Sequence, residues 1–187
     1  MTDTHPVERE VKLPFGSADE ARAAVAGLEA TPLHPRRLQD DRLLDTPGDD
    51  LKARRCALRV RLEGGQSRLT FKGPVQPGPM KIREELETSV GDGVLLLRVL
   101  AELGFRPWFR YQKYREEFAL PDLVVAIDET PIGVFVELEG SEKAIDETAA
   151  RLGRTRADYV LGSYFTLFQQ WRAAHGGTVP HMVFDAS

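Results

Sequence analysis

Charged side chains alternate with apolar ones along several strand-like segments of this chain, and this alternation constrains the fold more than any other feature. Successive side chains of a strand point to opposite faces, so residues two apart share a face. In segment 57–63, one face carries Arg59, Arg61 and Glu63, and the other face is aliphatic. Five further segments repeat the pattern, with faces that carry Glu8, Glu10 and Lys12; Thr70 and Lys72; Arg83, Glu85 and Glu87; Lys113, Arg115 and Glu117; and Glu137 and Glu139.

These charged faces have two interpretations. They could face water, as in any sheet that is covered on one side, and for a single strand this is the simpler interpretation. Solvated faces usually mix Thr, Ser, Gln and Lys, whereas the faces of these six segments are nearly restricted to Glu, Arg and Lys. The aliphatic faces also need cover, which amphipathic helices can provide. We therefore predict a barrel with a charged interior and helices outside.

Periodicity, capping residues and turn residues predict the elements of this barrel. Helices are expected over residues 17–30, 92–103, 141–152 and 157–174. Strands are expected near residues 7–13, 37–45, 56–63, 67–73, 81–89, 109–119, 122–128 and 133–140. An even number of strands allows closure, so the predicted fold class is α+β, an eight-stranded antiparallel β-barrel with helices packed outside. Residues 1–175 are expected to form a single domain, and residues 176–187 a loose C-terminal tail.

The last predicted helix is rich in aromatic residues. Its helical positions include Tyr164, Phe165, Phe168 and Trp171. Such a cluster could bind an aromatic ligand, but core packing is the expected role for aromatic residues at this spacing.

Composition excludes some classes of function. The 187 residues carry a formal net charge of −4, which argues against a protein that coats nucleic acid. Cys56 is the only cysteine, so no intrachain disulfide can form, and a reducing compartment is expected. The N-terminal residues show no secretory signal, and the longest aliphatic run, 94–97, is too short to cross a membrane. We expect a cytoplasmic protein with no membrane and no nucleic-acid partner.

A barrel interior lined with charges needs compensation. Moving one ion out of water costs several kcal/mol even after relaxation, so a dry charged interior is not expected. Divalent cations and a polyanionic ligand satisfy both signs of charge together, because carboxylates hold Mg²⁺ or Mn²⁺ while Arg and Lys bind phosphate oxygens. The sequence therefore predicts that the acids hold metal and the bases hold phosphate.

Several motifs occur in order along the chain. Residues 8–12 read Glu-Arg-Glu-Val-Lys, an ExExK motif. Further segments are Gln39, Asp41, Asp45, Thr46 and Pro47; 57–61; 69–73; 83–87; 113–115; Asp128; 133–140; and 163–165. Together these segments resemble the CYTH family, or triphosphate tunnel metalloenzymes, which includes class IV adenylyl cyclases, thiamine triphosphatases and inorganic tripolyphosphatases. The chain departs from the family pattern where Leu43 and Leu44 replace the usual aromatic residues.

The resemblance implies a role for each group of charged residues. The residues that would bind a divalent metal, Mg²⁺ or Mn²⁺, are Glu8, Glu10, Asp128, Glu137 and Glu139. The residues that would hold the triphosphate are Lys12, Arg59, Arg61, Lys72, Arg83, Lys113 and Arg115. Lys12, Glu85 and Asp128 would assist catalysis, although Asp128 could instead cap the turn before Pro131. Glu63, Glu87 and Glu117 are expected to brace the bases through ion pairs.

Two reactions suit such a site. Hydrolysis of a triphosphate (tripolyphosphate, thiamine triphosphate or a nucleoside triphosphate) is preferred, because it needs only the phosphate clamp and water. Cyclisation of ATP to cyclic AMP and pyrophosphate also needs a pocket for the base, and no sequence motif identifies one. A non-catalytic polyphosphate-binding module and a glycosidase-like carboxylate pair fit less well. The family analogy also allows a homodimer.

Overall fold

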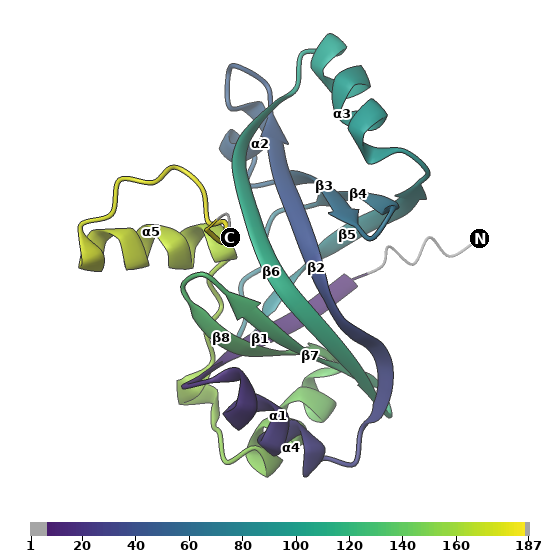
Figure 1. The fold of residues 1–187 in the computed structure, drawn as a ribbon. Helices are drawn as coiled ribbons and strands as arrows, with labels where there is room; N and C mark the ends of the chain where they lie inside the picture. The colour runs from purple at the N-terminus through teal and green to yellow at the C-terminus, as the bar shows by residue number, and fades with distance from the viewer. Residues whose placement is uncertain (1–6, 186–187) are drawn as a thin grey trace.

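Eight antiparallel strands close into a barrel in the computed structural model, which describes residues 7–185. The strands are β1 Val7–Phe15, β2 Thr31–Asp45, β3 Ala57–Glu63, β4 Gln66–Lys72, β5 Lys81–Val90, β6 Arg106–Leu120, β7 Leu123–Thr130 and β8 Gly133–Gly140. Their order around the barrel is β1-β5-β4-β3-β2-β6-β7-β8 (Figure 1). The predicted fold class is therefore confirmed.

Strands β2 and β6 are longer than predicted and form one long curved pair (Figure 1). The sequence interpretation began β2 at residue 37, because Pro32 and Pro35 interrupt the strand pattern. The β2–β6 pairing instead continues to Thr31 through register shifts on either side of His34. Bulges of this kind accommodate prolines, which cannot donate to a strand ladder. The strand extension was therefore hidden by residues that usually end strands.

Three of the predicted helices are present with the expected caps. They are α1 Ala18–Ala26, α3 Gly93–Glu102 and α4 Glu142–Arg151. Their N-cap side chains, Ser17, Asp92 and Ser141, each accept a hydrogen bond from a backbone N–H of the first turn. The short helix α2 Asp50–Ala53 was not predicted. No helix within residues 7–185 is both long and apolar enough to span a membrane.

The helix predicted over residues 157–174 is wrong at its start. Residues Arg156–Asp158 form a 3₁₀ turn, η1, and the helix α5 spans Tyr164–His175 with Ser163 as its N-cap. The reason is a bridge to β1, where Lys12 and Val160 exchange backbone hydrogen bonds of 3.2 and 2.9 Å. This bridge holds residue 160 extended, so the helix cannot begin until the chain has passed it.

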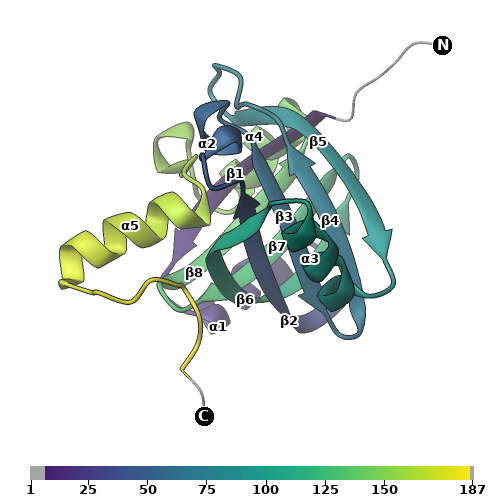
Figure 2. The same cartoon turned by 90° about the horizontal axis from the view of Figure 1, so that it is seen from above.

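The helices cover the outside of the barrel in separate groups (Figure 2). Helices α1 and α4 pack over β1, β7 and β8, where residues such as Leu13, Ile127 and Leu138 form the largest core. Helix α3 packs against β3 and β4. Helix α5 packs Phe168 against Phe109, in an aromatic cluster that confirms the predicted core role of Phe168. The charged faces of the strands therefore line the barrel interior.

The described part of the predicted C-terminal tail contacts the barrel at Met182. Gly176 adopts a left-handed conformation (φ 64°) that ends α5 and turns the chain. Met182 then pairs with β6, donating to the Arg110 carbonyl at 3.1 Å and accepting from the Gln112 N–H at 2.8 Å. Its side chain is only 1% exposed, so apolar burial holds a segment that has no helical or strand periodicity.

Candidate active site

The barrel encloses a cavity of about 600 Å³, which lies within the usual size range of small-molecule sites. Its walls include almost every residue to which the sequence assigned a role. These residues are Glu8, Glu10, Lys12, Arg59, Arg61, Lys72, Arg83, Glu85, Lys113, Arg115, Glu137 and Glu139. The alternation of charges therefore marks the inner surface of a tunnel, and the alternative of a water-facing outer surface is excluded.

Carboxylates predominate on the cavity wall formed by β1 and β8, which also carries Lys12. Glu10 and Glu139 occupy directly paired positions on these two strands. Burial and the neighbouring Glu10 carboxylate raise the pKa of Glu139 and raise that of Glu8 to about 8. Glu139 makes no hydrogen bond or ion pair with any other described residue. We call Glu8, Glu10 and Glu139 the acidic wall.

The basic side chains differ in how firmly other residues hold them. Arg61 makes a bidentate contact with the fully buried Asp41, at 2.9 and 3.2 Å. The Nε atom of Arg59 is buried and has no hydrogen-bond partner within residues 7–185. A buried donor without a partner costs free energy, and a phosphate oxygen in the cavity would remove that cost. Arg59 also lies 3.6 Å from Asp41 and 3.4 Å from Glu87, so its Nε–H is the donor that an anionic ligand would satisfy.

Asp128 lies outside the cavity lining and anchors two of the bases. Lys113 donates to its Oδ2 at 2.7 Å, and Arg115 donates to both oxygens at 2.7 and 2.6 Å. The Tyr164 hydroxyl donates to Oδ2 at 2.6 Å. A carboxylate accepts about four hydrogen bonds, so these donors occupy the oxygens that the sequence assigned to metal. The contacts favour positioning of Lys113 and Arg115 as the role of Asp128.

Glu137 also forms ion pairs with cationic side chains. It accepts a hydrogen bond from Arg115, and its Oε1 lies 3.3 Å from Lys12 Nζ. Burial alone would raise the pKa of Glu137, but Arg115 and Lys113 hold it well below its usual value. Lys12 also donates to Glu10 at 3.0 Å. Glu137 and Glu10 thus fix Lys12 in the cavity wall.

Three functional candidates were missed by the sequence interpretation. Lys81 lines the cavity and donates to Glu10, and burial lowers its pKa to about 8. The rule that residues two apart share a face could have found it, because Lys81 precedes Arg83 by two positions. Tyr164 was predicted as a core residue, yet its hydroxyl reaches Asp128. Trp108 lines one end of the cavity and was placed outside the predicted strand.

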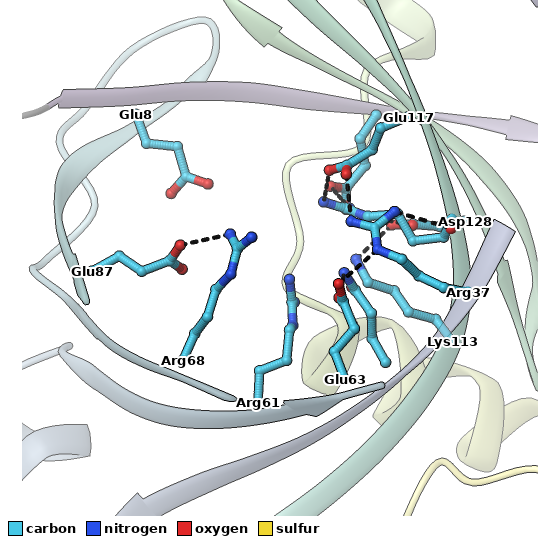
Figure 3. A network of polar contacts seen from close by, with 12 residues as sticks. Glu8, Arg37, Arg61, Glu63, Arg68, Glu87, Lys113, Glu117 and Asp128 are labelled. Carbon is cyan, nitrogen blue, oxygen red and sulfur yellow. Dashed lines mark hydrogen bonds and ion pairs between the residues drawn. The ribbon is translucent and has the colours of Figure 1, made fainter. Parts of the chain in front are cut away.

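The acids predicted to brace the bases do form ion pairs (Figure 3). Arg37 donates to Glu63 at 2.6 Å and also contacts Glu117. Arg68 donates to Glu87 at 2.9 Å. Of the bases predicted to hold phosphate, Arg59 lies 3.4 Å from Glu87 and Arg115 lies 3.7 Å from Glu117, whereas Glu63 pairs with Arg37 instead.

The acidic wall has the donor chemistry of a divalent-cation site. Carboxylate oxygens are the preferred ligands of Mg²⁺ and Mn²⁺, and Glu139 forms no ion pair with another described residue. In the present side-chain arrangement, no three Asp, Glu, His or Cys residues between 7 and 185 are placed to hold a metal together. The reason is that Lys72 draws Glu8 away at 2.8 Å, while Lys12 and Lys81 hold Glu10. The residues fit the metal chemically, and Glu8 and Glu10 would have to turn from these lysines to bind it.

The buried Arg59 Nε–H, which has no hydrogen-bond partner in residues 7–185, leads to a kinetic prediction. Arg59→Ala should raise the Michaelis constant for a triphosphate roughly 10- to 100-fold, because a hydrogen bond from a charged donor contributes about 1.5–3 kcal/mol. Steady-state kinetics with tripolyphosphate would measure the change. Arg110→Ala is the matched control, since Arg110 pairs with Asp40 outside the cavity. An unchanged Michaelis constant in Arg59→Ala would remove Arg59 from the phosphate clamp.

The CYTH domain matches residues 7–164, which is most of the chain, so this chain belongs to the CYTH family. A protein of Methanocaldococcus jannaschii that is named as a candidate adenylate cyclase is 32% identical over 113 residues. That match covers 60% of this chain and 65% of the relative, so it spans slightly less than two thirds of the relative's length.

Solved structures share the barrel. A candidate adenylate cyclase of Vibrio parahaemolyticus is similar with a TM-score of 0.77 and 19% identity, covering 89% of this chain and 99% of that chain. A protein of Pyrococcus horikoshii has a TM-score of 0.74 and 24% identity, covering 86% and 98%. A Hippeastrum protein, named as a candidate adenylyl cyclase and described as having a dominant triphosphatase activity, has a TM-score of 0.61 and 17% identity, covering 93% and 97%. At these identities the similarity shows the fold alone.

Proposed function

We propose that this protein is a metal-dependent enzyme that hydrolyses a triphosphate inside the tunnel. The observation that carries the proposal is one cavity lined by both carboxylates and bases, among which Arg59 has a buried Nε–H without a hydrogen-bond partner in residues 7–185. The triphosphatase activity described for the Hippeastrum protein, which has the same fold, supports the choice of reaction. Dependence on a divalent metal is general among triphosphate tunnel enzymes of the CYTH family.

The side chains of the chain would divide the work of hydrolysis. Arg59, Arg83 and the Asp128-anchored bases bind the phosphate oxygens and stabilise the charge that grows on the leaving phosphate. Lys12 remains a cation, because burial that would lower its pKa is outweighed by Glu10 and Glu137. A divalent metal bound at the acidic wall would polarise a phosphoryl oxygen as a Lewis acid.

Glu85 is the candidate for orienting the attacking water. Burial would raise its pKa, but a hydrogen bond with Glu8 and the charge of Lys72 lower it to about 2. Glu85 is therefore ionised at neutral pH and able to accept a hydrogen bond from water in the cavity. A residue that is always ionised orients a nucleophile better than it donates a proton, and we assign Glu85 that role.

Cyclisation of ATP is the second candidate. The relatives named as candidate adenylate cyclases support it. It also requires a surface for the adenine ring, and the cavity does include an aromatic residue, Trp108, at one end. Hydrolysis stays the preferred proposal, because it requires no further element than the phosphate clamp and a water molecule.

One incubation series separates the candidate functions. The protein is incubated with tripolyphosphate, thiamine triphosphate or ATP, each with Mg²⁺ or Mn²⁺, and the products are identified by phosphorus NMR. Release of orthophosphate supports hydrolysis, and cyclic AMP with pyrophosphate supports the cyclase. Binding without turnover of any substrate would contradict both enzymatic proposals and leave a binding module. The homodimer and the cytoplasmic location stay predictions.

A further inference from the structure

The two ends of the tunnel differ in chemistry. Toward one end, the cavity walls carry Arg68 and Glu87, which pair with each other, and Glu117, which pairs with Arg37 (Figure 3). At the other end, Leu44 pairs with Leu58 of β3 and Pro107 of β6, which brings three strand ends together. The cavity lining at that end consists of Leu43, Cys56, Ala57, Trp108 and Phe165, with Lys52 and Arg55 beside them. We call this end the aromatic mouth.

Trp108 faces the cavity because the strand is irregular at this point. In the β2–β6 ladder, Leu43 pairs with Phe109 and Leu44 pairs with Pro107, so Trp108 is an extra residue opposite no partner. A bulge of this kind changes the direction of a side chain, and bulges are frequent at barrel rims and beside active sites. Phe109 is 1% exposed in the aromatic core, whereas its neighbour Trp108 is only partly buried. Trp108 packs against this core and also lines the cavity.

Phe165 and Lys52 contact the indole ring of Trp108. The edge of the ring meets Phe165 at 4.8 Å between centroids, with an angle of 86° between the rings. Lys52 places its ammonium 3.9 Å from the centroid of the indole. The Lys52 side chain is 39% exposed, and Asp49 holds it at 2.7 Å. A ligand can displace such an exposed cation from the ring and stack in its place, because cation–π contacts at exposed sites are weak.

We propose that Trp108 determines which triphosphate the tunnel accepts, by stacking on a planar heteroaromatic group attached to the triphosphate. This inference rests on the proposed function, because it places the phosphate chain on the bases deeper in the same cavity. The phosphate chain enters the charged interior, and the organic group stays at the aromatic mouth. Inorganic tripolyphosphate has nothing to place on Trp108, so it gains nothing from the indole.

The test compares three ligands on three variants. Tripolyphosphate, ATP and thiamine triphosphate are titrated, each with Mg²⁺, into wild-type protein, Trp108→Leu and Trp171→Leu, and binding is followed by calorimetry. Trp108→Leu should bind ATP or thiamine triphosphate roughly 5- to 100-fold more weakly, with unchanged binding of tripolyphosphate. Trp171→Leu is the matched control, because Trp171 stacks on Phe168 and His175 and does not line the cavity. Trp108→Phe keeps an aromatic ring and should retain most of the affinity for the aromatic ligands.

A second measurement protects the test against a folding defect in Trp108→Leu. The chain has two tryptophans, so Trp171→Phe leaves Trp108 as the only indole. Stacking predicts that ATP or thiamine triphosphate quenches its fluorescence strongly and tripolyphosphate does not.

Equal loss of all three ligands in Trp108→Leu, or equal quenching by all three, would overturn the inference and leave the proposed function standing. A wild-type protein that binds tripolyphosphate as tightly as both aromatic ligands would overturn it too. Failure of the wild-type protein to bind any of the three ligands would instead overturn the proposed function, and this inference with it.

Discussion

Glu139→Gln is expected to lower metal-dependent turnover roughly 100- to 1,000-fold, since Lewis-acid assistance by a metal contributes several kcal/mol to catalysis. The same variant should be as stable as the wild-type protein. Glu139 is exposed on β8 and makes no hydrogen bond or ion pair with another described residue, so a neutral glutamine removes no stabilising contact. Turnover with Mg²⁺ and the thermal unfolding midpoint, measured without metal, together check the prediction.

Two variants serve as controls for Glu139→Gln. Glu147→Gln changes an exposed acid on α4, paired only with Lys143, and should alter neither activity nor stability. Glu137→Gln removes a partner of Arg115 and Lys12, so it should lower both activity and stability. Full activity in Glu139→Gln would remove Glu139 from the metal site. A large loss of stability would mean that it has a structural role.

Asp128→Ala is expected to destabilise the fold by about 3–5 kcal/mol, which is the usual effect of leaving buried charges without their partner. Asp128 is fully buried, and its loss leaves Lys113 and Arg115 without their shared carboxylate. Urea unfolding measures the free energy of unfolding. Because both bases also line the cavity, the affinity for triphosphate should fall in the same variant.

A graded series makes this prediction specific. Tyr164→Phe removes one hydrogen bond to Asp128 and should lower the free energy of unfolding by only about 1 kcal/mol. Asp128→Asn keeps the size of the side chain but not its charge, so its effect should fall between those of the other two variants. If Asp128→Ala unfolds within about 1 kcal/mol of the wild-type protein, as ordinary surface variants do, Asp128 does not anchor the two bases.

The tunnel could be predicted from the sequence because alternation along a strand is a local property. Arg59 and Arg61 share a face whatever the rest of the chain does, and repetition of that pattern left few places for the charged faces. The ExExK motif likewise placed Glu8, Glu10 and Lys12 on one face without knowledge of their neighbours. For these residues, the face predicted from local alternation is the face that lines the cavity.

The pairing of charges inside the tunnel could not be predicted, because it depends on register between strands. Asp128 meets Arg115 because the β6–β7 hairpin pairs these two positions, and a shift of one residue would separate them. Tyr164 reaches Asp128 because the Lys12–Val160 bridge fixes where α5 begins. The sequence therefore predicted a metal role for Asp128, whereas the contacts in the structure favour an anchoring role.

Trp108 shows a different limit of sequence interpretation. Counting residues in twos from Lys113 along β6 places Trp108 on the outer face of the barrel. The register shift between Leu43 and Leu44 reverses that expectation, and only the paired strand reveals it. Irregular strand positions beside a cavity are therefore the positions at which alternation is least informative.

The central claim is that the tunnel binds one triphosphate through the bases that line it, and calorimetric titration of tripolyphosphate with Mg²⁺ tests it most directly. The best variant for this test is Arg59→Ala combined with Arg83→Ala, because Arg59 Nε has no hydrogen-bond partner within residues 7–185 and Arg83 reaches Glu8 only at 3.5 Å. We predict binding of one triphosphate per wild-type chain, unchanged in Arg110→Ala and weakened roughly 100-fold or more in the double variant. Equal affinity of the wild-type protein and the double variant for tripolyphosphate would contradict the claim.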